Sequence, residues 1–216
     1  MMEVFLLVTV GWVFSVCLHE FGHAFVAYRG GDYTVKDKGY LTLNPVHYTH
    51  PVYSLLMPVV FMLMGGIGLP GGAVYINDEL LHSKKWRTAV SLAGPAMNLG
   101  LLFLLCLPFW FGVVHEKLGP GLAFLAQLQI SAIVLNLLPL PPLDGFRAIS
   151  PWLREDIRER LLANSNVFLW VLFIVMWYVQ PVNNAFWDVV NSTGGRLGIE
   201  PYLANEGLRQ FRFWEH

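Results

Sequence analysis

The sequence predicts an all-α polytopic membrane protein: a bundle of about 4–6 transmembrane helices with a re-entrant or broken segment and room for a short β-hairpin. Two observations predict this class. Of the 216 residues, 55% are hydrophobic and 13% are charged, whereas about a quarter of the residues in a typical soluble domain are charged. The apolar residues also form long blocks instead of the alternation that half-buried strands show. The formal net charge of −1 gives no argument for a nucleic-acid partner.

Four apolar blocks approach or exceed the roughly 17–25 residues that an α-helix needs to cross a bilayer. They are Val4–Tyr28, Ala89–Val114, Leu122–Leu143 and Val167–Val182. A fifth block, Val52–Leu69, is interrupted by Pro58 and runs into the glycine-rich stretch "GGIGLPGG". We therefore expect a membrane-embedded core over residues 1–182 and a polar C-terminal tail over residues 183–216.

The positions of Lys and Arg predict how these blocks are oriented, because cytoplasmic loops are enriched in both. Ten basic residues lie in three groups: after the first block (Arg29, Lys36 and Lys38), before the second (Lys84, Lys85 and Arg87) and after the third (Arg147, Arg154, Arg158 and Arg160). Between the second and the third block there is only Lys117. These three groups share one side only if Val52–Leu69 enters the membrane and returns. We therefore predict a re-entrant or broken segment there, with a full crossing as the alternative. The ends of the first and third blocks then lie together at the cytoplasmic face.

The first block carries the motif "HEFGH", which places two imidazoles and a carboxylate in an otherwise apolar helix. His19 and His23 are four residues apart, so they lie on one face of the helix and can bind one zinc ion. Glu20 follows the first ligand directly, where it can act as a general base on a water molecule. Incidental polar residues on a buried face are the alternative, but an ionisable group at the middle of a span costs about 2.5–3.5 kcal/mol. His23 lies five residues before Tyr28, roughly 8 Å from the cytoplasmic end of the block.

A catalytic zinc site usually has a third protein ligand, and the stretch "NLLPLPPLDGFR" over residues 136–147 offers one. It closes the third block at the face where the two histidines are expected, and its three prolines stop a regular helix. Asp144 follows these prolines and precedes Gly145, which permits a tight turn. A turn-forming Asp-Gly pair is the ordinary alternative. Asp144 gains weight as the third ligand because the topology independently brings it to the histidines.

Together these motifs resemble the site-2 protease family of intramembrane zinc metalloproteases. The family's order and membrane context are matched over roughly residues 5–150 by "HEFGH" in the first span, "SLAGPAMN" at the start of a later span and "NLLPLPPLDG" at the end of the next. The resemblance implies one Zn²⁺ per chain, held by His19, His23 and Asp144, with Glu20 activating the water. It also implies that Asn136 binds the substrate carbonyl or stabilises the oxyanion. The chain is similar to a small form of the family without PDZ or CBS domains.

The resemblance further implies a zinc metalloendopeptidase that hydrolyses peptide bonds in or near transmembrane segments of membrane proteins, in regulated intramembrane proteolysis. The expected partners are a transmembrane protein substrate and the lipid bilayer. We expect a multi-pass protein of the cell (inner) membrane, with its active site toward the cytoplasmic face. The sequence leaves the oligomeric state and the physiological substrate open.

Two alternative interpretations remain at the level of sequence. A membrane zinc protease of the CAAX-processing kind would need a distant Glu as third ligand, for which Glu79 and Glu116 are the available residues. A zinc-binding scaffold or transporter would lack protease activity altogether. A transporter is expected to carry ionisable residues along several spans and an internal repeat, whereas here they gather at one site.

Overall fold

The computed structural model describes residues 2–47 and 74–215, and within these residues every regular element is a helix. The α-helices are α1 (Met2–Arg29), α2 (Thr34–Asp37), α4 (Lys84–Trp110), α5 (Gly119–Asn136), α6 (Asp144–Ile149), α7 (Glu155–Ala163), α8 (Ser165–Tyr178), α9 (Gln180–Arg196) and α10 (Pro201–Phe211). Short 3₁₀ helices are η1 (Pro45–His47), η3 (Asp78–Leu80), η4 (Ser150–Trp152) and η5 (Phe213–Glu215). The all-α class is confirmed. The described end of the glycine-rich region, residues 74–77, forms no strand, and the predicted re-entrant segment Val52–Leu69 lies outside the described residues.

Three described helices are long and apolar enough to cross a membrane, namely α1, α4 and α5. The pair α7 and α8, bent by 62°, counts as a fourth span if it is taken as one. The third apolar block is helical only as far as Asn136, because the three prolines that follow interrupt the helix. The fourth block is divided at Val179, where α8 ends and α9 begins with Pro181 in its first turn.

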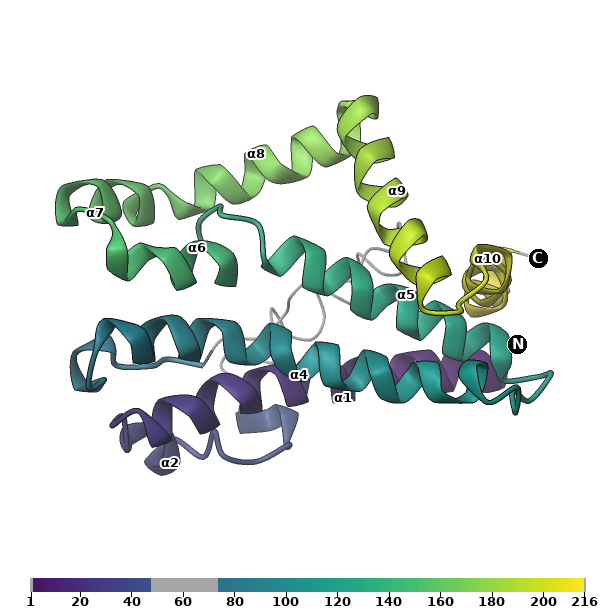
Figure 1. The fold of residues 1–216 in the computed structure, drawn as a ribbon, viewed down its shortest axis with the longest axis horizontal. Coiled ribbons are helices and arrows are strands. Elements are labelled where there is room, and N and C mark those ends of the chain that lie inside the picture. The colour runs from purple at the N-terminus through teal and green to yellow at the C-terminus, as the bar shows by residue number, and fades with distance from the viewer. Residues whose placement is uncertain (1, 48–73, 216) are drawn as a thin grey trace.

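The three long helices α1, α4 and α5 pack closely against one another (Figure 1). A Cβ added to Gly22 of α1 would lie 2.9 Å from the backbone oxygen of Ala93 in α4, and one added to Gly121 of α5 would lie 3.1 Å from Leu7. The start of α1 therefore packs on the start of α5, and the second half of α1 packs on the first half of α4. Figure 1 shows that α1 and α5 run in the same direction and α4 in the opposite one, so the ends of α1 and α5 face the same end of the bundle.

The described segments on either side of residues 48–73 meet at that same end. The backbone N–H of His82 donates to the carbonyl of Gly30 at 2.9 Å. Helix α4 begins there, with the Ser83 hydroxyl accepting from the N–H of Trp86 at 3.4 Å. This arrangement brings the start of α4 to the end of α1, which is where the histidine motif lies.

The residues expected to form a polar tail are helical and contribute to the core. Helix α10 packs along α5, where a Cβ on Gly207 would lie 2.0 Å from the carbonyl oxygen of Pro120. Phe211 is fully buried, and its ring stacks on Phe5 of α1 at 5.3 Å between centroids. Residue 183 falls inside α9. The division into a core over residues 1–182 and a tail over 183–216 stays a prediction.

Candidate metal centre

Three ligand-type side chains converge at the second half of α1. His19 and His23 lie one turn apart on α1, and Asp144 is the first residue of α6. Their ligand atoms form the one group of three or more potential metal ligands among the described residues. The Nε2 atoms of the two histidines are 3.0 Å apart, and Asp144 Oδ2 lies 3.1 Å from His19 Nε2 and 3.4 Å from His23 Nε2.

These separations fit a zinc ion. With bonds of about 2.0–2.2 Å, a tetrahedral zinc site places its nitrogen and oxygen ligands about 3.3–3.6 Å from one another, close to the 3.0–3.4 Å seen here. Two imidazoles and one carboxylate also leave the fourth position of a tetrahedron for water or substrate. Both histidines are at least 93% buried (6% and 7% exposed), so the centre is screened from bulk solvent.

Helix α4 orients the histidine rings from the opposite side. Nδ1 of His23 lies 2.7 Å from the carbonyl oxygen of Val90. Because a carbonyl only accepts hydrogen bonds, Nδ1 carries a proton, and Nε2 is the ring nitrogen left to bind a metal. A Cβ on Gly94 would lie 2.3 Å from Nε2 of His23 and 2.6 Å from Nε2 of His19. Gly94, in the "SLAGPAMN" stretch of α4, therefore leaves the space in which the ligand atoms meet.

The short helix α6 carries Asp144 into place because it is docked at both ends. A Cβ on Gly145 would lie 2.2 Å from the carbonyl oxygen of Leu137, so only glycine allows α6 to approach the end of α5 this closely. The Thr88 hydroxyl of α4 donates to the carbonyl of Ala148 at 2.7 Å. Burial raises the pKa of the Asp144 carboxyl, but the neighbouring imidazoles of His23 and His19 outweigh it and hold the pKa below its usual range. Asp144 is therefore ionised, which is the form that binds a metal.

Glu20 is buried next to the ligands but is directed to another partner. Its Oε2 accepts a hydrogen bond from the backbone N–H of Val74 at 3.1 Å. A carboxylate held by one oxygen keeps the second oxygen for another donor. Sequence patterns had no signal for this contact, because it is made by a backbone amide 54 residues away.

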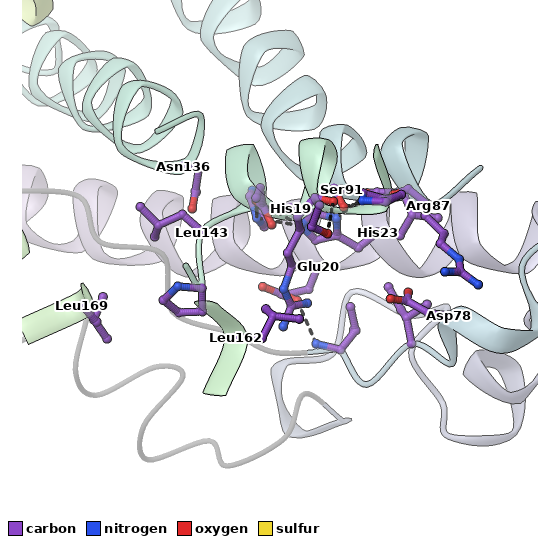
Figure 2. A pocket seen from close by; sticks show the side chains of 18 residues that line it. His19, Glu20, His23, Asp78, Arg87, Ser91, Asn136, Leu143, Leu162 and Leu169 are labelled. Carbon is purple, nitrogen blue, oxygen red and sulfur yellow. Dashed lines mark hydrogen bonds and ion pairs between the residues drawn. The ribbon is translucent and has the colours of Figure 1, made fainter. Parts of the chain in front are cut away.

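A cavity of about 400 Å³ adjoins the centre (Figure 2). Asn136, at the last residue of α5, and Leu143 lie on one side, and Asp78 and Arg87 lie on the other, with the histidine motif between them. Val74 and Ile76 line it as well, as do Leu162 of α7 and Leu169 of α8. The structure thus brings all five sequence-predicted site residues to one cavity, with Asn136 buried (3% exposed) at its wall.

The alternative third ligands do not reach the centre. Glu79 is exposed in η3, and its backbone N–H is bonded to the side chain of Asn77. Glu116 is exposed in the connection between α4 and α5, where it lines a separate cavity with Glu3 from the first turn of α1. Neither belongs to a ligand group in the part of the chain that the structure describes.

Comparisons with known proteins find close relatives along nearly the whole chain. The chain is 46% identical over 213 residues to the "Putative zinc metalloprotease Rip2" of Mycobacterium tuberculosis. The matched region covers 98% of this chain and 82% of the relative. It is 44% identical over 214 residues to the protein of the same name from Mycolicibacterium smegmatis, with the same coverage. It is 32% identical over 192 residues to the "Putative zinc metalloprotease YwhC" of Bacillus subtilis, which covers 83% of this chain and 84% of the relative. No family model and no solved structure matches the chain.

Proposed function

The chain belongs to the zinc metalloprotease family of Rip2 and YwhC, in keeping with its resemblance to the site-2 proteases, and on this premise we propose that it hydrolyses peptide bonds in or near the transmembrane segments of other membrane proteins. One observation carries the proposal. Two of the three ligands, His19 and His23, and the neighbouring Glu20 belong to a helix that is apolar and long enough to cross a membrane. His23 lies six residues before the end of α1, about 9 Å along the helix axis. A peptide bond would have to reach this depth to be cleaved.

We further propose one zinc ion per chain, held by His19, His23 and Asp144. Zinc supplies Lewis-acid chemistry when bound: it polarises a carbonyl and lowers the pKa of a water from 15.7 toward about 7. Glu20 keeps Oε2 on the N–H of Val74, and its Oε1 takes a proton from the attacking water and passes it to the leaving amine nitrogen.

The proposed setting is a multi-pass protein of the cell membrane, with the cavity open toward the cytoplasmic face. The basic residues counted in the sequence support this orientation. The apolar residues Leu162 and Leu169 on the cavity wall support access by an apolar substrate segment. A substrate helix must be extended there before cleavage, because a helical peptide group is engaged in its own hydrogen bonds.

Zinc removal tests the reaction directly. The purified protein is placed in liposomes together with a tagged single-span membrane protein that carries an Asn-Pro pair near the cytoplasmic end of its span. We expect this substrate to be cut into two fragments, inside or next to the span. A zinc chelator should abolish cleavage, and added Zn²⁺ should restore it, because the proposed reaction requires the metal. Mass spectrometry of the fragments locates the cut.

Cleavage restricted to water-soluble peptides would contradict the intramembrane part of the proposal. Zinc bound at one ion per chain with no cleavage of membrane or soluble substrates would favour the alternative, a zinc-binding membrane protein without protease activity. A matched soluble peptide of the same sequence serves as the second arm of the experiment.

Asn136 is expected to stabilise the oxyanion through its side-chain amide. Asn136→Ala should lower kcat by about 10²–10³-fold, as the removal of one such donor does in other proteases, while zinc content stays at one ion per chain. The matched control is Asn191→Ala, which removes an amide bonded to Gln127 on α5, away from the cavity. An unchanged kcat in Asn136→Ala would contradict the assigned role.

A further inference from the structure

A buried carboxylate outside the metal centre joins two segments that are distant in sequence. Asp32, in the turn between α1 and α2, is fully buried (0% exposed). Its Oδ1 accepts from the backbone N–H of Thr34 at 3.0 Å and from the Thr34 hydroxyl at 2.6 Å. Its Oδ2 accepts from the backbone N–H of Asn77 at 2.7 Å, across 45 residues of chain. The bonds to Thr34 alone would make an ordinary turn, so the bond to Asn77 calls for a different explanation.

Within the described residues, the Asp32 carboxylate is stabilised by hydrogen bonds and not by an ion pair. No ion pair to Asp32 is found among the described Lys, Arg and His side chains. An ionised carboxylate removed from water is costly unless donors surround it, and charge-assisted bonds are the strong ones. Residues 74–77 are therefore held firmly at Asn77. A second tie comes from Lys38, whose Nζ donates to the carbonyl of Tyr75 at 2.8 Å.

The other end of this segment reaches the reaction site. Three residues before Asn77, the N–H of Val74 donates to Oε2 of Glu20 at 3.1 Å. Val74 and Ile76 line the cavity next to the metal centre. Residues 74–77 thus connect Asp32 at one end to Glu20 at the other, and any shift of the segment changes the donor that fixes the Glu20 carboxylate.

We propose that Asp32 is a positioning residue for Glu20. By holding Asn77, it keeps the N–H of Val74 on Oε2 and leaves Oε1 of Glu20 free for proton transfer. The inference rests on the proposed function, because it assigns Asp32 a part in the proton transfer by Glu20. A displacement of about 1 Å in a reacting group can lower a rate by about 10²-fold, so the effect on kcat should be large although Asp32 touches neither metal nor substrate.

The first test is Asp32→Asn in the full chain, which keeps the size of the side chain but loses its charge and one acceptor oxygen. We expect kcat to fall about tenfold to a hundredfold, with KM within about twofold and zinc content unchanged. Hydrogen–deuterium exchange of a peptide covering residues 74–77 should become faster. The matched control is Asp37→Asn, an exposed carboxylate in α2 for which the described residues offer no ion-pair partner, and it should resemble wild type in all four measurements.

A second pair of variants tests the same hydrogen bond from an exposed position. Asn77→Pro eliminates the backbone N–H that Asp32 accepts. Asn77→Ala keeps this N–H and loses only the side-chain bond to the N–H of Glu79. Because the side chain of Asn77 is exposed, neither change disturbs the core. We expect Asn77→Pro to reproduce the kcat loss and the faster exchange of Asp32→Asn, and Asn77→Ala to keep wild-type values.

Wild-type kcat in Asp32→Asn, or equal kcat in Asn77→Pro and Asn77→Ala, would overturn the inference. A parallel loss of zinc, kcat and melting temperature in Asp32→Asn, without a difference between the two Asn77 variants, would do the same and assign Asp32 a structural role. Absence of cleavage by the wild-type protein would instead contradict the proposed function. The exchange of residues 74–77 would still report whether Asp32 holds the segment.

Discussion

A Glu20→Gln variant is expected to bind zinc as the wild type does and to cleave its substrate about 10²–10⁴-fold more slowly, which is the usual contribution of a general base. Glutamine has nearly the same size, and its amide oxygen can still accept from the N–H of Val74. It cannot take a proton from water. The loss should therefore appear in kcat, with the metal content measured on the same preparation.

The matched control for this substitution is Glu3→Gln. Glu3 lies in the first turn of the same helix and lines a different cavity, so its loss of charge should leave both zinc content and kcat unchanged. Unimpaired proteolysis by Glu20→Gln would contradict the proposed mechanism. Loss of zinc in Glu20→Gln would mean that the carboxylate belongs to the ligand set.

Gly94→Ala is expected to weaken zinc binding by about two orders of magnitude or more and to abolish cleavage. The added Cβ would lie 2.3 Å from Nε2 of His23 and 2.6 Å from Nε2 of His19, so at least one ring must leave its position. Displacing the partners of metal-binding histidines already lowers metal affinity about 10–100-fold, and here the ligand atoms themselves are displaced. Zinc affinity is measured by competition with a chelator of known affinity.

The control lies on the same helix. Gly100→Ala adds a methyl group that meets nothing within 4 Å beyond its chain neighbours and the backbone of its own helix, and it should leave zinc affinity unchanged. Alanine is favoured over glycine inside a helix by about 1 kcal/mol, so neither substitution weakens α4 through its backbone. Asp144→Ala, which removes one proposed ligand, provides the reference for a damaged site. Wild-type zinc affinity in Gly94→Ala would contradict the proposed ligand geometry.

Much of the fold follows from local patterns in the sequence. Three of the four long apolar blocks correspond to helices that can span a membrane. The ends of α5 and α8 were harder to place, because hydrophobicity continues past Asn136 and Tyr178 while prolines nearby end the helices. The helical packing of residues after 183 was not foreseen, since α10 is amphipathic and reaches its partner α5 only in the folded bundle.

The candidate site likewise has features that the sequence predicts and features that only the structure shows. The pairing of His19 with His23 depends on a spacing of four residues, which any α-helix places on one face. The nearness of Asp144 could be expected from the count of basic residues, because it required only the direction of each span. The contact of Glu20 with Val74 and the space left by Gly94 could not be predicted in this way. A backbone amide and a missing side chain leave no pattern in the sequence.

The sequence by itself determined the membrane class, the helical spans and the histidine pair, because these depend on composition and on the geometry of a single helix. Only the tertiary structure decided how the ligand group closes around a point, how Glu20 is held and how Asp32 is joined to it. These features depend on distances between residues 45 or more positions apart in the chain. Such distances are set by the packing of α4 against α1 and of α6 against α4, and no local pattern encodes them.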